Sequence, residues 1–457
     1  MQTKAPKKVL LLALGSGIAI VVIGFMKIAP ELEDAEQAYY SQWWRWGYDD
    51  QPPLYTWLQM LVNRVFGVSK FSFSFLRALI FSATLWSVYI FALEFLKDKT
   101  KAVLVVLSLL FIPTFIDFTF RRLSHTSLLI LVILATYLLI HRLRHHKNLL
   151  NYMLLGIVVG MGILTKYNYF LLLGSLFLLL FFDREFRNIV CDRRILLSSV
   201  LVVLIVAPHF HWLFYHQEHL LELGHSIDLK TGVAKGNGLF LISSLFASIL
   251  TLVKLIGPVL ILVLALFFLK QLRFRAYPKG NWLYKLFILQ LLVLILVFVA
   301  LDVQNIETRW LLPLFVPFLV LLIHTVDFTR PERWVRYGFY MFLTVLAIQT
   351  LRTPTEKLLG ISSSVHYGFH PISNTLKKEY AKRQWVMPNV TYGGNIRLLN
   401  PDREVFSTDD FSLPQEKIDS LNAVFLRIND GTVPNAIVTD SIYNFGKEGE
   451  TLFFVRF

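Results

Sequence analysis

The chain has 457 residues, of which 55% are hydrophobic and only 17% are charged. A soluble globular protein is less apolar than this, so the composition indicates a protein that crosses a membrane many times. The net charge of +14 does not indicate nucleic-acid binding, because the Lys and Arg residues lie in small clusters between apolar runs, as they do in cytoplasmic loops. The single cysteine, Cys191, excludes an intrachain disulfide and a metal site built from several cysteines.

The chain begins with the basic residues 1–8, followed by the apolar run 9–28. This order is typical of a cleaved signal peptide and also of a first membrane span. The run is long enough to cross a hydrocarbon core of about 30 Å, and no small-residue cleavage site follows it. We therefore expect an uncleaved first helix that starts in the cytoplasm.

Eleven apolar segments are predicted to span the membrane, although several are shorter than the about 20 residues of an ordinary span. They cover residues 9–28, 73–96, 102–116, 126–140, 149–164, 169–182, 195–214, 239–269, 282–301, 310–326 and 334–351. The sequence therefore predicts an α-helical, polytopic membrane protein.

The connections between these segments alternate in charge. One set is rich in Lys and Arg throughout: residues 1–8, 97–101, 141–148, 183–194, 270–281 and 327–333. The other set carries most of the Asp and Glu that precede the C-terminal tail: residues 29–72, 117–125, 165–168, 215–238 and 302–309. By the positive-inside rule, the basic set is cytoplasmic and the acidic set faces the periplasm or cell exterior, in a protein of the plasma or inner membrane.

The first outer connection contains an unusually polar stretch, residues 30–70. Six carboxylates fall within twenty residues there: Glu31, Glu33, Asp34, Glu36, Asp49 and Asp50. For Glu31, Glu33 and Asp50 taken singly, we expect ordinary solvated loop carboxylates. Their combined density nevertheless indicates that this connection does more than join two spans.

Asp34 and Glu36 differ from the others because they lie close to Tyr39, Tyr40 and Trp43. A carboxylate held against aromatic surface is partly desolvated, which raises its affinity for protons and suits it to act as a general base. Aromatic side chains of this kind also suit the faces of sugars and isoprenoid chains, although an interfacial aromatic belt is the simpler explanation for them.

Asp50 and Gln51 directly precede the pair Pro52-Pro53. Two prolines fix the local backbone and so aim the polar pair before them at a defined point. Residues 54–67 then have apolar side chains at helical spacing, which predicts a helix lying in the membrane interface.

Arg121 and Arg122 lie in the second outer connection, against the positive-inside trend. Arginine binds phosphate oxygens through two parallel hydrogen bonds, so a phosphate on the outer face is one expected ligand. Pairing with loop carboxylates or with lipid headgroups is an equally good expectation.

Two further cations lie at the outer ends of spans. Lys166 lies between two spans beside Tyr167, and Arg309 precedes Trp310. A lysine at the membrane surface usually extends its ammonium toward water, and a phosphate ligand is the alternative. Histidines 209, 211, 216 and 219 raise the question of a metal site, but no fixed ligand set accompanies them and we expect ordinary interfacial histidines.

The composition changes after residue 351. Residues 352–457 have no long apolar run, and they contain short strand-like segments at 423–428, 436–440 and 451–457. Turn signals separate these segments, at 393–395, 400–402 and 429–431. We therefore expect a small α/β domain, residues 352–457, on the outer side of a membrane domain formed by residues 1–351.

Several of these motifs together resemble glycosyltransferase family 39. The resemblance rests on residues 34–54, the Phe66-Gly67 pair, Arg77, residues 156–167 and residues 309–313. This group contains protein mannosyltransferases, the aminoarabinose transferases of lipid A, and membrane glycosyltransferases of the lipopolysaccharide galacturonic-acid transferase type. The resemblance covers most of residues 10–330 and depends on the order and spacing of motifs that are individually weak.

The resemblance implies a GT-C fold, a sugar donor linked to polyprenyl phosphate, and transfer by an inverting, direct displacement. A carboxylate of the first outer loop would act as the base or orient the acceptor. The acceptor would be lipid A or lipopolysaccharide, another glycolipid, or a protein. No cofactor is implied with certainty, and a divalent metal stays open.

The resemblance also assigns roles to particular residues. Counting back from residues 46–48 favours Asp34 as the base, and counting back from Tyr39 favours Glu36; we take Asp34. The residues expected to bind the donor phosphate are Arg121, Arg122, Lys166 and Arg309. Those expected to bind substrate are Tyr39, Tyr40, Trp43, Asp50, Gln51, His125 and Tyr167.

Two positions depart from the family pattern. Relatives often carry a lysine where this chain has Gln51, so the phosphate-binding charge must come from other residues. Many relatives carry an aspartate where this chain has His125, which affects the choice of donor or acceptor. A transporter or flippase of lipid-linked sugars is the main alternative function, and a non-catalytic scaffold is the second. Transporters place their polar groups near the midplane, whereas here they gather at one surface.

Overall fold

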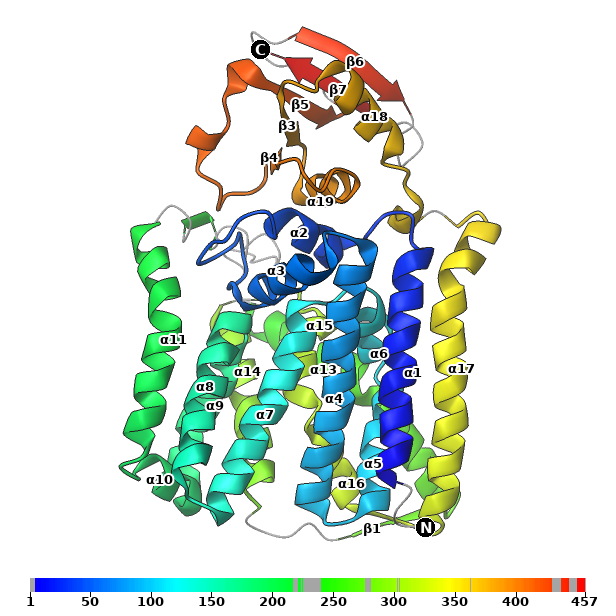
Figure 1. The fold of residues 1–457 in the computed structure, drawn as a ribbon. Coiled ribbons are helices and arrows are strands. Elements are labelled where there is room, and N and C mark those ends of the chain that lie inside the picture. Colours follow the sequence, from blue (N-terminus) through cyan, green and yellow to red (C-terminus); the bar gives the residue numbers. More distant parts are fainter. Residues whose placement is uncertain are drawn as a thin grey trace.

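The structure of the protein is a computed structural model. It describes residues 5–216, 221–222, 224, 240–275, 281–301, 303, 305–361, 363–429, 437–443 and 450–456. A bundle of helices forms the larger part, and a small unit with a five-stranded sheet lies over one end of the bundle (Figure 1). The predicted connection 215–238 and the predicted turn 429–431 lie mostly outside the described residues.

All eleven predicted spans fall on helices of the bundle. These helices are α1 (Ala5–Met26), α4 (Lys70–Leu96), α5 (Lys99–Ser108), α6 (Pro113–Arg121), α7 (His125–His145), α8 (Leu149–Thr165), α9 (Tyr169–Phe182), α11 (Ile195–Tyr215), α13 (Phe240–Phe268), α14 (Trp282–Ala300), α15 (Thr308–Phe315), α16 (Phe318–His324) and α17 (Pro331–Leu358). The protein is thus a multi-pass membrane protein, as the composition predicted.

The predicted spans differ in length and in how apolar they are. Among the described residues, six helices are long and apolar enough to cross a membrane, or seven if the pair formed by α5 and α6 counts as one span. That pair bends by 79°, at the point where Pro113 opens α6. The other predicted spans are short (α8 and α9), divided (α15 and α16) or less apolar (α17). Apolar stretches in the sequence do not distinguish full spans from such pieces.

Glycines allow two of the helices to pack closely. A Cβ atom on Gly156 of α8 would lie 2.6 Å from the carbonyl oxygen of Ser198 in α11, and one on Gly160 would lie 2.9 Å from the side chain of Ile205. Small residues four apart let two backbones approach within a membrane, where packing rather than water exclusion drives association.

The polar connections are divided between the two ends of the bundle (Figure 1). The start of α1, α10 (Arg184–Val190) and β1 (Leu272–Phe274) lie at one end. β1 pairs with β2 (Val326–Phe328) in a two-stranded antiparallel sheet. The short helices α2 (Leu32–Tyr40) and α3 (Leu54–Phe66) lie at the other end, below the small sheet unit.

The small unit contains a sheet with the strand order β4-β3-β5-β7-β6. Its strands are β3 (Gln384–Met387), β4 (Val405–Ser407), β5 (Ala423–Ile428), β6 (Ile437–Tyr443) and β7 (Thr451–Arg456). β3 runs parallel to β4 and β5, and β7 runs antiparallel to β5 and β6. The predicted strand at 423–428 is confirmed as β5, and the other two predictions correspond to β6 and β7.

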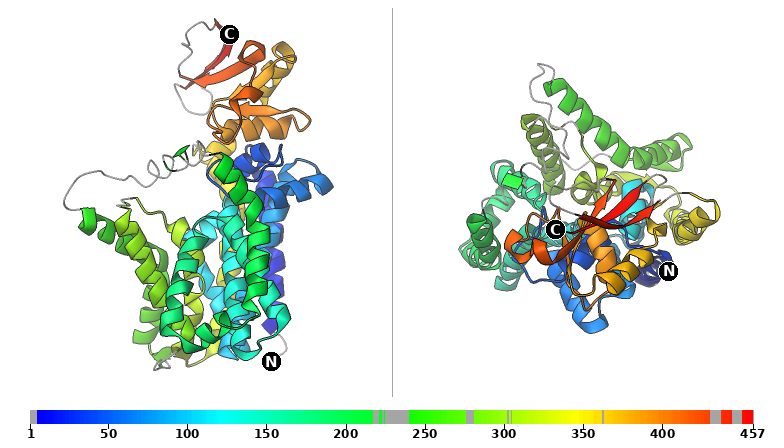
Figure 2. Two further views of the ribbon diagram at one scale, coloured as in Figure 1. Left: turned by 90° about the vertical axis from the view of Figure 1, so that its left-hand side faces the viewer. Right: turned by 90° about the horizontal axis from the view of Figure 1, so that it is seen from above.

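Two helices accompany this sheet, α18 (His370–Glu379) and α19 (Val390–Leu399). Buried Trp385, Ile396 and Phe454 belong to its hydrophobic core, which is separate from the core of the bundle. The side and top views place the sheet over the middle of the bundle end rather than beside it (Figure 2). Within this arrangement, α19 lies directly against α2.

Candidate active site

The centre of the candidate site is α2, a nine-residue helix enclosed between the bundle and α19 (Figure 1). Its first turn contains Glu33 and Asp34, where negative charge interacts favourably with the helix dipole. Seven of its nine residues are buried. Our expectation that Glu33 is a solvated loop carboxylate is therefore wrong, because its exposed fraction is only 7%.

Glu33 is held by groups from two other elements. Its Oε2 accepts a hydrogen bond from the hydroxyl of Ser124 at 2.6 Å and another from the Ser124 amide. Arg309 approaches Oε1, with Nη1 at 4.0 Å. Burial by itself raises the pKa of Glu33, but the charge of Lys166 and the hydrogen bonds from Ser124 outweigh it and lower the pKa overall. Glu33 is thus an ionised, buried carboxylate.

Lys166 lies in the connection between α8 and α9. Its Nζ donates a hydrogen bond to Thr126 Oγ1 at 2.9 Å. Burial, with a contribution from Arg309, lowers the pKa of Lys166 overall, although the negative charges of Glu33, Asp50 and Glu36 act in the opposite direction. Among the described residues, no carboxylate lies within 4.0 Å of its ammonium group. Lys166 therefore keeps its capacity to bind an anion.

His125, at the start of α7, joins several parts of the site. Its Nε2 lies 3.1 Å from the amide nitrogen of Gln37, and its Nδ1 lies 3.3 Å from the carbonyl oxygen of Thr165. An amide nitrogen can only donate, so Nε2 accepts and Nδ1 carries the proton. The ring also packs against Tyr55, with 5.2 Å between the ring centroids. Both nitrogens of this neutral imidazole are thus engaged by the protein.

Asp34 faces a different group of charges. Its carboxylate forms an ion pair with Arg77 of α4, whose Nη1 also donates to the carbonyl oxygen of Arg121 at 2.8 Å. Lys27 and Glu31 pair nearby, at 3.0 Å. Asp34 is thus part of a buried charge network that joins α2, α4, α6 and the segment just after α1, whereas the charge of Lys166 acts on Glu33, one residue earlier.

The four predicted phosphate-binding cations also form two groups, one that acts on Glu33 and one that pairs with other carboxylates. Arg309 approaches Glu33, and the charge of Lys166 acts on the same carboxylate. The Arg121 guanidinium lies 3.8 Å from Glu356 of α17. Arg122 lies 3.4 Å from Asp117 and stacks over the ring of Phe118. Of the two expectations for the arginine pair, the structure therefore shows pairing with carboxylates.

The aromatic residues at the end of α2 and just after it have hydrogen-bond partners within the protein. Tyr39 donates to Asp410 Oδ2 at 3.1 Å, and Trp43 donates to Glu404 at 2.7 Å. Both partners belong to the C-terminal unit. Tyr40 donates to Asp49 Oδ2 at 2.8 Å. These contacts hold the loop against its surroundings, and substrate binding by the three side chains stays a prediction.

The loop before Pro52-Pro53 forms a tight turn. Tyr48 and Gln51 exchange two backbone hydrogen bonds, and Asp49 has a left-handed φ of +38°. Gln51 donates to its neighbour Asp50 at 3.0 Å. Burial, and then the charge of Asp50, raise the pKa of Asp49 to about 9. The charge of Asp50 also acts on Lys166 and on Tyr167, so the turn directs Asp50 toward the Glu33 site.

Glu36 lies one turn after Glu33 on α2 and is partly buried. Its charge acts on Tyr40 and on Lys166. Tyr167 lies beside His209, with 3.3 Å between its hydroxyl and Nε2. No group of three His, Cys, Asp or Glu residues able to hold a metal ion occurs in the described part of the chain. His219, one of the four histidines considered above, lies outside it.

Sequence reasoning missed Glu33, Ser124 and Asp410 as parts of this arrangement. A signal for Glu33 was available, because it lies three residues before Glu36 and so shares a helix face with it. No sequence signal indicated Asp410, whose side chain is completely buried between Arg45 and Tyr39. Its importance depends on a contact between residues about 370 positions apart.

Comparisons with known proteins show what the chain is similar to. Residues 50–212 match the family described as dolichyl-phosphate-mannose-protein mannosyltransferase. The lipopolysaccharide core galacturonosyltransferase RgtB of Rhizobium johnstonii is 26% identical over 454 residues, covering 91% of this chain and 90% of the relative. RgtA of the same organism is 26% identical over 404 residues, covering 83% of this chain and 77% of the relative.

The fold also matches a solved structure. The crystal structure of ArnT from Cupriavidus metallidurans bound to undecaprenyl phosphate superposes with a TM-score of 0.63, at 13% identity, over 97% of each chain. The resemblance to glycosyltransferase family 39 is thus confirmed. The family match, the two relatives and the shared fold identify the chain as a membrane glycosyltransferase of the GT-C type, related to glycosyltransferase family 39.

Proposed function

We propose that the protein transfers a sugar from a polyprenyl-phosphate donor to a lipopolysaccharide or related glycolipid acceptor at the outer face of the inner membrane. The observation that carries this proposal is the buried, ionised Glu33, whose pKa is lowered by the nearby cation Lys166 and whose carboxylate is approached by Arg309. An inverting displacement on a sugar phosphate needs a base that takes the proton of the acceptor and cations that stabilise the leaving phosphate. A carboxylate beside two cations offers both.

Lys166 and Arg309 would bind the donor phosphate. As the bond between the anomeric carbon and the phosphate oxygen breaks, negative charge grows on the leaving phosphate, and nearby cations stabilise it. Lys166 has no carboxylate within 4.0 Å among the described residues and holds only a neutral hydroxyl partner, Thr126. Its hydrogen-bonding capacity is therefore available to a phosphate oxygen.

Glu33 would receive the proton of the acceptor hydroxyl. The acceptor oxygen forms its bond to the anomeric carbon from the face opposite the phosphate, and its proton passes to the carboxylate. In the empty site the charge of Lys166 lowers the pKa of Glu33. A bound phosphate would neutralise that charge and so raise the pKa of Glu33, making it a stronger base once the donor is in place.

The geometry favours Glu33 over the two carboxylates preferred from sequence. Asp34 is already engaged by Arg77. Glu36 stays a candidate for contact with the sugar or the acceptor, because its charge acts on Lys166. Asp50, through its effect on Lys166 and Tyr167, is the loop residue best placed to join it.

His125, Gln51 and Tyr167 would then position these groups. His125 holds Gln37 of α2 and the end of α8, and Gln51 holds Asp50. Arg121 and Arg122 would support the site through the Asp34 network rather than by binding phosphate. We further propose that residues 1–351 form the catalytic membrane domain and residues 352–457 an extracytoplasmic domain.

The relatives support the substrates in this proposal. RgtB and RgtA are lipopolysaccharide core galacturonosyltransferases, and the solved structure with the same fold holds undecaprenyl phosphate. A flippase has less support, because these relatives are transferases and the polar groups gather at one end of the bundle instead of at its midplane.

Mass spectrometry of envelope glycolipids tests this function. In a strain that lacks the gene, one lipopolysaccharide or glycolipid species should lose the mass of one sugar, and the wild-type chain should restore it. The Glu33→Gln variant, expressed at the same level, should not restore it. Unchanged glycolipids in the deletion strain would contradict the proposal, as would full restoration by Glu33→Gln.

A further inference from the structure

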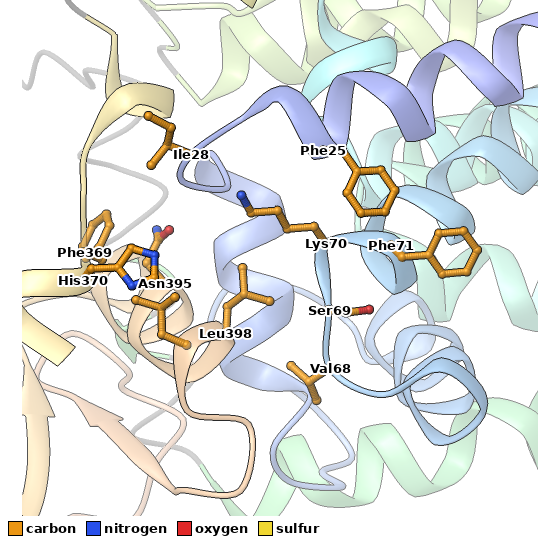
Figure 3. A pocket seen from close by; sticks show the side chains of 11 residues that line it. Phe25, Ile28, Val68, Ser69, Lys70, Phe71, Phe369, His370, Asn395 and Leu398 are labelled. Atoms are coloured by element: carbon orange, nitrogen blue, oxygen red, sulfur yellow. The ribbon is translucent and has the colours of Figure 1, made fainter. Parts of the chain in front are cut away.

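A cavity lies away from Glu33, where the bundle meets the C-terminal unit (Figure 3). Its volume is about 360 Å³, which is within the range of small-molecule sites. It is lined by the end of α1, the connection between α3 and α4, the start of α18 and the end of α19. None of its lining residues belongs to the candidate active site.

The two sides of the cavity differ: the first is mainly apolar, and the second mixes polar side chains with the apolar Phe369 and Leu398. Phe25 and Phe71 lie on the first, with 6.5 Å between their ring centroids, and Phe25 is 59% exposed. His370 and Asn395 lie on the second, and the side chain of Lys70 extends between the two (Figure 3). A ligand that fills this space is therefore amphipathic.

The charge of the lining is positive. Lys70 is the cation, and the eleven lining residues include no Asp or Glu. In the described part of the chain no carboxylate lies within 4.0 Å of the Lys70 ammonium, whose recorded hydrogen bond goes to the carbonyl oxygen of Lys27. An ammonium group has three donors, so it can bind an anion as well.

The position of the cavity indicates where its ligand comes from. α1 ends at Met26 and α4 begins at Lys70, and both helices are long and apolar enough to span the membrane. Phe25 and Lys70 therefore lie at the level where the hydrocarbon core gives way to lipid headgroups. A membrane lipid at this level matches the cavity, because its apolar chains can lie along the apolar lining and its charged headgroup can lie near the polar groups.

We propose that this cavity binds an anionic phospholipid of the surrounding membrane. Its phosphate contacts Lys70, with His370 and Ser69 as further polar contacts, and its chains begin along Phe25 and Phe71. Because the two sides of the cavity come from the bundle and from the C-terminal unit, the bound lipid also joins these two parts.

Native mass spectrometry of the purified full-length chain tests this site, with phosphatidylglycerol and phosphatidylcholine of equal chain length as probes. The wild-type protein should retain phosphatidylglycerol severalfold better than phosphatidylcholine. Lys70→Gln should remove this preference, and Lys70→Arg should keep it. Arg64→Gln is the matched control, because Arg64 is an exposed cation on α3 that does not line the cavity. Equal losses in Lys70→Gln and Arg64→Gln would overturn the proposal.

A second variant tests the cavity itself. Leu398→Trp fills the part of the space beside Asn395 and should weaken retention of both lipids, whereas retention as in the wild type would show that lipid binds elsewhere. Adding polyprenyl phosphate should not displace phosphatidylglycerol. Displacement would identify the carrier lipid of the sugar donor as the occupant and would overturn the assignment to a membrane phospholipid. These measurements of lipid binding do not depend on whether the protein transfers a sugar, so the two proposals can fail separately.

Discussion

Gly394 of α19 lies so close to Ala35 of α2 that a Cβ atom on the glycine would be 1.7 Å from the Ala35 carbonyl oxygen. The backbone of the C-terminal unit thus touches the helix that carries Glu33. Gln42, just after α2, strengthens this contact by exchanging two hydrogen bonds with the backbone of Val405. The C-terminal unit is therefore part of the structure that positions the candidate site.

Gly394→Ala should disturb this contact. The atom that a new methyl group would meet is backbone and cannot rotate away, so α19 must move off α2, at a cost of about 1–3 kcal/mol. We expect about a tenfold slower sugar transfer and a lower apparent unfolding temperature. Gly368→Ala is the matched control, because a Cβ there meets no atom within 4 Å. Equal activity of the two variants would contradict the positioning role of α19.

Asp410→Asn tests the same interface through its charges. The Asp410 carboxylate receives hydrogen bonds from Tyr39 at 3.1 Å and from Arg45 at 3.0 Å, and its exposed fraction is 1%. Neutralising one member of a buried ion pair leaves the other charge without a partner and costs about 3 kcal/mol. Limited proteolysis should therefore release the C-terminal unit faster than in the wild type. Asp402→Asn, on the exposed surface of the same unit, should leave the rate unchanged.

Lys166→Met should weaken binding of the donor phosphate and its stabilisation as it leaves. We expect a loss of about 100-fold in kcat/KM for the donor, and a smaller loss in Lys166→Arg, which keeps the charge. The variant also removes the main charge that lowers the pKa of Glu33. The acidic limb of the pH–rate profile should then move to higher pH. Lys99→Met, an exposed lysine at the start of α5, should show neither change.

The raised pKa of Asp49 predicts that the stability of the protein depends on pH. Its pKa is raised to about 9 in the folded protein, by burial and by Asp50, from a usual value of 3.8. The folded state therefore binds a proton more tightly than the unfolded state does. Asp49 contributes stability that is fully present below its unfolded pKa and is lost as the pH rises through about 9. Asp49→Asn imitates the protonated form.

Thermal unfolding between pH 5 and about pH 10 measures this effect. The apparent unfolding temperature of the wild type should fall with rising pH more steeply than that of Asp49→Asn, and the variant should be the more stable at the alkaline end. Parallel curves for the two proteins would mean that Asp49 is ionised in the folded state at neutral pH.

The sequence was most informative where a single physical pattern decides the structure. Apolar runs in the sequence predicted the helices of the bundle, because helices embedded in a membrane must be apolar. The same pattern could not separate full spans from the bent pair α5 and α6, because composition does not record where a helix breaks. Strand β3 was missed because its four residues carry no clear alternation.

The candidate site was predicted less completely for a different reason. Polar density identified the stretch 30–70, and Lys166 and Arg309, which the sequence singled out, both act on Glu33. The choice between neighbouring acids depends on which side of α2 each one faces, and therefore on packing partners distant in sequence. Asp34 meets Arg77 and Glu33 meets Ser124, and neither contact follows from local spacing.

The most direct test of the central claim is the rate of sugar transfer by purified Glu33→Gln in reconstituted membranes, with a polyprenyl-phosphate sugar as donor. Loss of a general base slows a reaction by about 10²–10⁴-fold, and we predict a loss in this range with donor binding retained. Glu307→Gln is the control, because Glu307 is an exposed acid that also pairs with Arg309, and it should keep most of the activity. A Glu33→Gln rate within about threefold of the wild type, far outside that range, would contradict the account.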